Sequence, residues 1–192
     1  MPSIMTDIVT HHDYQDLVAV AQRFGVRVKE DWNEPEGARF IGTFTGHEIT
    51  LFPRNDSYLT LYFTVAHLYG HMVQLVRPSL QTDQALLESN GGLSAAQVQG
   101  VFDHEYEAAE IGRKLMAETG PITRGLELEY TRTFWADFNY LINFMETGEK
   151  GPEVFARFMR RQPLIKDTIQ PDPRPLLDLA TFTPPNVDVV VV

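Results

Sequence analysis

The segment Tyr58 to Val76 (YLTLYFTVAHLYGHMVQLV) is dense in apolar residues and contains no proline. A turn-forming stretch, PRNDS at 53–57, precedes it, and Pro78 follows it. Proline and Asn or Asp residues interrupt regular structure, so the pattern predicts one long helix between these two breaks. The chemistry of the chain depends on two histidines in this helix.

His67 and His71 are four residues apart. On a helix this spacing places them above one another on one face, so both imidazoles can point at a common position. A tetrahedral zinc ion requires that geometry from two of its ligands. The pair alone is a weak signal, because helices carry such pairs by chance and a histidine can equally be hydrogen-bonded inside a core. A metal site would also need a third protein ligand.

Candidates for that ligand lie in the segment 103–116 (DHEYEAAEIGRKLM), where carboxylates are interspersed with small and apolar residues. We expect Glu107 as the third ligand, with Glu105 as its competitor. His104 could be a fourth ligand or a hydrogen-bond partner of a ligand. Each glutamate belongs to a helical stripe: Glu107 with Ile111 and Leu115, and Glu105 with Val98, Val101, Ala108 and Gly112.

The chain of 192 residues contains no cysteine, so neither a disulfide framework nor a thiolate metal site is possible. A transition metal would have to be held by histidine and carboxylate. We expect Zn²⁺, with Ni²⁺, Fe²⁺ or no metal as alternatives. The length suits one domain with a substantial core.

Further elements are predicted on either side of the histidine helix. The capping-box pair Ser94 and Gln97 marks the start of a helix that runs to about Glu118, with a break permitted at Gly100 or Asp103. The remaining elements are a helix over 13–24 closed by Gly25, a hairpin over 39–52, a strand over 26–28, an aromatic-rich helix over 124–145 and a short helix over 152–159.

The C-terminal part of the chain changes character. Six prolines between Pro163 and Pro185 preclude a long helix and favour an extended segment lying over the domain. We therefore divide the chain into a main domain, 1–162, and an extended proline-rich tail, 163–192. The closing VDVVVV could add an edge strand or mediate homo-oligomer formation.

The histidine segment also carries a family resemblance. TLYFTVAHLYGHMVQL, preceded by HEITLF and followed by EYEAAEIGRKLM, resembles the ImmA/IrrE family of zinc-peptidase-like proteins, within the gluzincins. In that family a strand leads into a helix of the form FTLAHELGH, and a later helix with an EA..FA..LL pattern supplies a glutamate ligand. The matching residues are Phe63, Thr64, Ala66, His67, Gly70 and His71 in the first motif, and Glu107, Ala108, Ile111, Gly112, Leu115 and Met116 in the second.

This resemblance covers roughly residues 38–118. It implies an α+β, zincin-like single domain, in which a small β-sheet packs on the active-site helix and two further long helices. It also implies a zinc ion held by His67, His71 and Glu107.

The chain departs from the family at Leu68, where the HExxH motif has its glutamate. In the family that glutamate takes a proton from the zinc-bound water and passes it to the leaving amine. Leucine can do neither, and such assistance is worth roughly 10²- to 10⁴-fold in rate. The resemblance therefore implies a pseudo-metallopeptidase that binds metal and acts as a binding or regulatory module.

Two alternatives stay open at this point. One is an active zinc metallohydrolase with a displaced general base, supplied by Glu105, Glu110 or His104. The other is a metal-free structural or interaction protein on the same scaffold, with His67 and His71 hydrogen-bonded in the core.

Charge and patterning limit the partners. The formal net charge of −10 argues against nonspecific attachment to nucleic acid or to an anionic membrane. No signal-peptide pattern and no run of about 20 apolar residues is present, so we expect a cytoplasmic protein. By analogy with the peptidase-like fold that the resemblance implies, the strand over 47–52 is expected to present an edge on which an extended peptide or protein segment could pair.

Overall fold

The computed structural model describes residues 8–33, 41–53, 57–77, 93–149, 151–160 and 167–183. Within these residues the fold is α+β, as the sequence predicts, with five α-helices and one three-stranded sheet. The elements are α1 (His11–Arg23), β1 (Arg27–Glu30), β2 (Gly42–Thr45), β3 (Glu48–Leu51), α2 (Tyr58–Val76), α3 (Ala95–Ala117), α4 (Arg124–Thr147), α5 (Pro152–Arg160) and the 3-10 turn η2 (Leu179–Thr181).

The sheet has the order β1-β3-β2. The predicted hairpin is confirmed: β2 and β3 are antiparallel, and Gly46 turns between them with a φ of 55°. β1 pairs with β3 in parallel. The expectation that 47–52 presents an edge is wrong, because every residue of β3 has a partner in both neighbouring strands. Among the described strands, the edges belong to β1 and β2.

α2 and α3 begin where the sequence predicts, whereas α1 begins at His11, two residues before the predicted start. The predicted box of Ser94 and Gln97 opens α3, whose helix continues through Gly100 and Asp103 without a break. A second capping box, Thr10 with Asp13, opens α1. α2 has the predicted limits, with the Ser57 side chain accepting a hydrogen bond from the backbone of Thr60.

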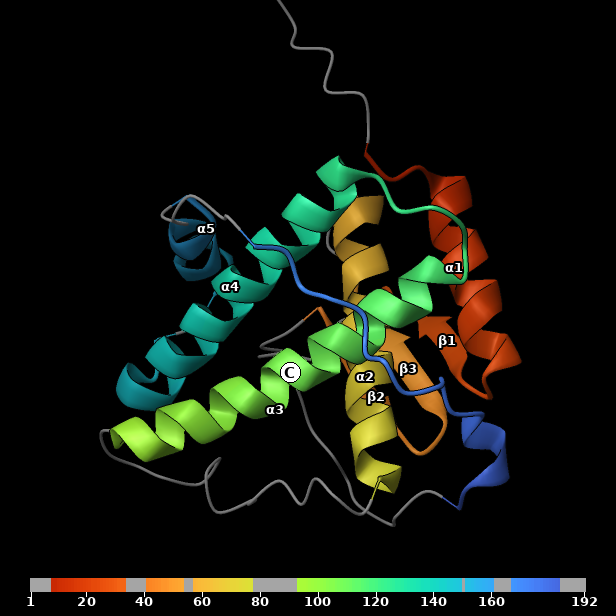
Figure 1. Ribbon diagram of the computed structural model, residues 1–192. Coiled ribbons are helices and arrows are strands. Elements are labelled where there is room, and N and C mark those ends of the chain that lie inside the picture. Colours follow the sequence, from red (N-terminus) through yellow and green to blue (C-terminus); the bar gives the residue numbers. More distant parts are fainter. Residues whose placement is uncertain are drawn as a thin grey trace, which may run out of the picture.

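α2 is the central element of the fold. It lies between α3 on one side and α1 and the sheet on the other (Figure 1). Twelve of its residues are buried, and they include His71 and Gln74 among apolar neighbours. In the described part of the chain, no helix is long and apolar enough to cross a membrane.

α2 and α3 cross at very short range. A Cβ atom at Gly70 would overlap the carbonyl oxygen of Ala108, and one at Gly112 would lie 2.6 Å from the carbonyl oxygen of Ala66. The backbones can approach this closely only because the facing residues are glycine and alanine. The crossing therefore sets the rotation of α3 relative to α2.

α4 covers α3 with the aromatic residues that the sequence assigns to the core. Phe134, Phe138 and Tyr130 are buried, and the rings of Phe134 and Phe138 pack against Phe102 of α3. Tyr130 donates a hydrogen bond to the carbonyl oxygen of Ala109. α4 is thereby anchored directly to α3.

Residues 167–183, which we call the strap, run across α3 towards the end of α1 (Figure 1). Ile169 and Leu179 of the strap are buried in the same core as the helices. At the far end, the Leu179 backbone N–H donates to Phe24, and Ala180 packs directly on Gly25. The connection 78–92 and the closing VDVVVV lie outside the described residues.

Replacement of Gly112 by alanine should lower the free energy of unfolding by about 1–3 kcal/mol, because the added methyl group forces the two helices apart. Denaturant unfolding of the purified variant measures this loss. The matched control is Gly125→Ala on α4, where an added Cβ meets only the Thr123 hydroxyl at 3.9 Å. That control should keep or slightly raise stability, since alanine favours helix. Equal stability of both variants would contradict the tight crossing.

Candidate metal centre

Three side chains from two helices converge beside this crossing. His67 Nε2 lies 3.0 Å from Glu105 Oε2, and His71 Nε2 lies 3.0 Å from His67 Nε2. His71 Nε2 is also 3.3 Å from Glu105 Oε2. The side chains are 14 %, 4 % and 8 % exposed for His67, His71 and Glu105 respectively. This buried group of two imidazoles and one carboxylate could hold a metal ion, with the potential ligand atoms all within 4.8 Å of one another.

The helix crossing brings Glu105 to the histidines. Glu105 precedes Ala108 and Gly112 by three and seven residues, so it shares the face of α3 that packs on α2. The two histidines follow Ala66 and Gly70, the residues of α2 that meet this face. Of the two glutamates considered from the sequence, the structure therefore joins the competitor, Glu105, to the histidines.

Glu107, the sequence's first choice, faces elsewhere. It forms an ion pair with Arg174 of the strap and accepts a hydrogen bond from Gln74 Nε2 at 3.1 Å. Its Oε1 and Oε2 are thus directed to side chains other than the histidine pair. The preference for Glu107 over Glu105 is not supported by this geometry.

His104 lies beside the group. Its ring centroid is 5.0 Å from that of His71, and its backbone carbonyl accepts from Gln74 Nε2 at 2.8 Å. Burial and the neighbouring His71 lower the pKa of His104 to about 4, so its ring is neutral at pH 7. His104 is a neighbour of the three converging residues.

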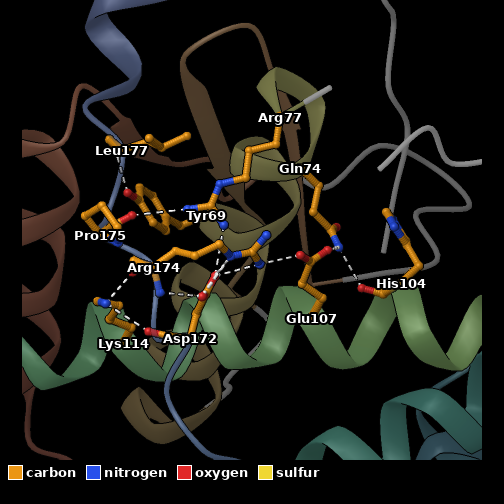
Figure 2. A network of polar contacts seen from close by, with 10 residues as sticks. All are labelled: Tyr69, Gln74, Arg77, His104, Glu107, Lys114, Asp172, Arg174, Pro175 and Leu177. Carbon is orange, nitrogen blue, oxygen red and sulfur yellow. Dashed lines mark hydrogen bonds and ion pairs between the residues drawn. The ribbon is translucent and has the colours of Figure 1, made fainter. Parts of the chain in front are cut away.

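The amide of Gln74 determines which ring nitrogen of His71 carries a proton. Figure 2 shows the Nε2 end of this amide between Glu107 and His104. Gln74 Nε2 faces two acceptors, the His104 carbonyl and the Glu107 carboxylate, so its Oε1 must face His71 Nδ1. The separation of Oε1 and Nδ1 is 2.9 Å. An amide oxygen can only accept, and Nδ1 therefore donates. In the neutral ring this leaves the lone pair on Nε2, the atom that points at His67 and Glu105.

The centre is consequently a cluster of electron-pair donors around a single position. Burial would raise the pKa of Glu105, but the charges and hydrogen bonds of His71 and His67, when these rings are protonated, outweigh it and hold that pKa well below its usual range. When His71 is neutral, its Nε2 and the Glu105 carboxylate can only accept, so at least one proton must lie among these two atoms and His67 Nε2. A cation in place of that proton would satisfy all three atoms.

Nitrogen and carboxylate oxygen are donors that divalent transition metals accept, and three protein ligands leave one tetrahedral position open. The donor set thus fits a metal ion such as zinc. A metal-bound histidine usually donates a hydrogen bond from the ring nitrogen that does not bind the metal. His71 has this arrangement, because its Nδ1 donates to Gln74 Oε1 while its Nε2 points at His67 and Glu105.

Leu68, which the resemblance aligns with the glutamate of HExxH, is 1 % exposed. It packs against the sheet: a Cβ atom added at Gly42 of β2 would lie 3.0 Å from Leu68 Cδ1. The side chain therefore fills the core between α2 and β2. No proton-accepting group is present at this position.

An acidic residue that the sequence analysis missed lies on α4. Asp137 is only partly exposed and stands between the buried residues Phe134 and Leu141 on the inner face of the helix. Burial, together with the negative charge of Glu105, raises the pKa of Asp137 to about 7. The signal in the sequence was a carboxylate on the predicted core face of an aromatic helix.

Glu110 and Tyr69 point to the strap. Burial and the charges of Asp172 and Glu107 raise the pKa of Glu110, and Tyr69 donates its hydroxyl to the Leu177 carbonyl at 2.8 Å. Of the bases considered from the sequence, Glu105 belongs to the converging group and Glu110 lies among the strap contacts.

The strap is held on α2 and α3 by a polar network (Figure 2). Asp172, whose side chain is 2 % exposed, accepts from Arg77 at 2.9 Å and from Arg174. Burial opposes ionisation of Asp172, but hydrogen bonds from Arg174 and Arg77 prevail and lower its pKa to about 2. Lys114 donates to the backbone carbonyls of Asp172 and Arg174. The strap thus meets the helices through charged contacts close to Glu107.

Comparison of the chain with protein-family models, with curated proteins and with solved structures gave no match.

Proposed function

We propose that this protein is a metal-binding domain of the zinc-peptidase type that has lost efficient hydrolysis and acts as a binding or regulatory module. The observation that carries the proposal is the convergence of His67, His71 and Glu105, with the lone pair of His71 directed inward by Gln74. A surface cluster of histidine and carboxylate would be commonplace. This cluster is buried, and its potential ligand atoms all lie within 4.8 Å of one another.

The residues of the centre have separate roles. His67, His71 and Glu105 would bind the ion, and Gln74 holds His71 in the ligating tautomer. A bound zinc ion would polarise a carbonyl group or lower the pKa of a water molecule. In HExxH enzymes a glutamate at this position transfers the proton of the attacking water. Leu68 is apolar and can neither accept nor donate a proton, so it cannot carry out this transfer.

The resemblance to the ImmA/IrrE family supports the proposal. β3 leads into the histidine helix α2, and the later helix α3 provides the carboxylate. The ligand position differs, because the family pattern aligns with Glu107 whereas Glu105 faces the histidines. The zincin-like assignment of the fold is part of this proposal.

Metal analysis tests the proposed function. Protein purified after metal-replete expression should hold about one equivalent of zinc, nickel or iron, and both His71→Ala and Glu105→Ala should lower this below a tenth of an equivalent. His47→Ala, outside the centre, is the control and should retain the metal. Less than a tenth of an equivalent in the wild type would refute the proposal and favour the metal-free scaffold.

The sheet suggests how a protein partner could bind. β2 is an edge strand beside the centre, since its Phe44 ring stacks on His71 with centroids 6.4 Å apart. We propose that an extended peptide pairs with the outer edge of β2, which no described strand occupies, instead of with the central β3.

A peptide selected for binding to the wild type should slow amide hydrogen exchange in β2, because new backbone hydrogen bonds protect the pairing strand. Exchange in β1, the opposite edge, serves as the internal control and should not change. Pairing at β2 would be excluded if the peptide protected β1 alone or protected neither edge strand.

A second candidate function, slow hydrolysis, is favoured by Asp137. Its pKa of about 7, raised by burial and by the charge of Glu105, lies in the range suited to a general base at neutral pH. Asp137 could accept the proton of an attacking water in place of the missing glutamate.

If so, zinc-loaded wild type should cleave a peptide library slowly, with a rate that rises with pH through about 7 as Asp137 loses its proton. Asp137→Asn should lower that rate by at least ~10²-fold. The control is Glu110→Gln, which removes another carboxyl of raised pKa that lies on the strap side. Absence of turnover in the wild type would leave the pseudoenzyme proposal standing alone, whereas turnover that is unchanged in Asp137→Asn would exclude Asp137 as the base.

A further inference from the structure

A continuous chain of hydrogen bonds connects the strap to the candidate metal centre. Figure 2 shows its first part, from Arg174 through Glu107 to Gln74. Arg174 donates to Glu107 Oε1, and Glu107 Oε2 accepts from Gln74 Nε2. Gln74 Oε1 then accepts from His71 Nδ1. The direction of each hydrogen bond follows from its partners. Guanidinium only donates and carboxylate only accepts, and the Gln74 amide directs its donor Nε2 at Glu107 and its acceptor Oε1 at His71. The proton position on His71 is therefore the last link of a chain that begins on the strap.

The interior of this chain is shielded from water. Gln74 is 2 % exposed, and the Glu107 side chain is 14 % exposed. In such surroundings an unsatisfied donor or acceptor is costly, so the members enforce one another's orientation. Arg174 is the outermost member, with 43 % of its side chain exposed.

Arg174 also holds the strap in place. It contacts both carboxylate oxygens of Asp172 and donates its backbone N–H to Oδ1 of the same residue. The guanidinium thus bridges Asp172 of the strap and Glu107 of α3. If the strap left its position, Glu107 would lose its ion pair.

We propose that Arg174 is a positioning residue that keeps Nδ1 of His71 protonated, through Glu107 and Gln74, and so couples docking of the strap to cation binding at the centre. The coupling to the cation rests on the proposed function, whereas the effect on the His71 tautomer exists in the metal-free protein. Because coupling between two sites is reciprocal, a bound cation should in turn stabilise the docked strap.

Coulomb's law and the hydrogen-bond chain predict opposite effects of removing Arg174. A positive charge near the centre repels a cation, so its loss alone would tighten binding. Without its ion pair to Arg174, Glu107 can turn away from Gln74, and the Gln74 amide is then held by the His104 carbonyl and not by both acceptors. A less firmly held amide fixes the Nδ1 proton of His71 less firmly, which weakens binding. Changes to partners of metal ligands typically cost about 10- to 100-fold in affinity. The sign of the change therefore separates the two effects.

The test compares Arg174→Met with Arg77→Met. Each removes one positive charge and the side-chain ion pair with Asp172, but of the two only Arg174 contacts Glu107. Nitrogen-15 NMR of the imidazoles in metal-free protein reports the tautomer, and competition with a chelator reports the zinc affinity. We expect Arg174→Met to mix the His71 tautomers and to weaken zinc binding by about tenfold. Arg77→Met should retain the Nδ1–H tautomer and bind zinc as tightly as the wild type or more tightly.

An unchanged tautomer in folded Arg174→Met, or tighter zinc binding, would overturn the inference. Should Arg174→Met not fold, Gln74→Met replaces it, because it removes the acceptor of the His71 proton and leaves the strap contacts of Arg174 intact. The same loss of tautomer is expected there, and its absence would equally overturn the inference. If the tautomer depends on Arg174 but wild type binds no zinc, the positioning role stands and the proposed function fails.

Hydrogen exchange measures the reciprocal effect. Zinc added to the wild type should slow exchange of the strap amides of Asp172 and Leu179, which donate to Glu110 and Phe24. In Arg174→Met zinc should leave these amides unaffected. Equal slowing in both proteins would show that coupling does not pass through Arg174 and would overturn that part of the inference.

Discussion

The backbone approach of α2 and α3 is the constraint on which the centre depends. Gly70 and Gly112 remove the side chains that would keep the helices apart, and Ala66 and Ala108 complete the contact. At this separation α3 cannot rotate freely, because any larger residue turned into the interface would meet backbone atoms. One rotation of α3 is selected, and it directs Glu105 towards the two histidines. The helix packing thus determines which carboxylate belongs to the site.

Much of the fold follows from local signals in the sequence. The limits of α2 follow from the breaks on either side, and the start of α3 follows from Ser94 and Gln97, whose side chains satisfy backbone groups of the first turn. The hairpin follows from β-branched residues around a glycine turn. The position of β1 in the sheet does not, because the pairing of a four-residue strand depends on packing against α1 and not on its own residues. The error about the edge at 47–52 has this origin.

The site could be predicted in part for a similar reason. Helical spacing is enough to bring His67 and His71 together, since both lie on one element. The third residue comes from another helix, and two stripes of α3 fit equally well by periodicity. The small residues Ala108 and Gly112, one and two turns after Glu105, were the signal that favoured its stripe. Gln74 and Asp137 carried no motif, and their roles depend on neighbours that only the folded chain supplies.

The energetic cost of the centre favours a binding role over a purely structural one. Burial of an ionised glutamate beside two histidines carries a desolvation penalty, and well-packed apolar residues of similar volume often stabilise a protein equally or better. The fold supplies such residues throughout the interior of α2, including Leu68 at the next position after His67. A chain that needed only packing here could use leucine at each of these positions. The chain instead has two histidines and a glutamate there, together with a glutamine that directs the His71 lone pair inward. A cation that compensates the desolvation penalty explains these residues better than core packing does.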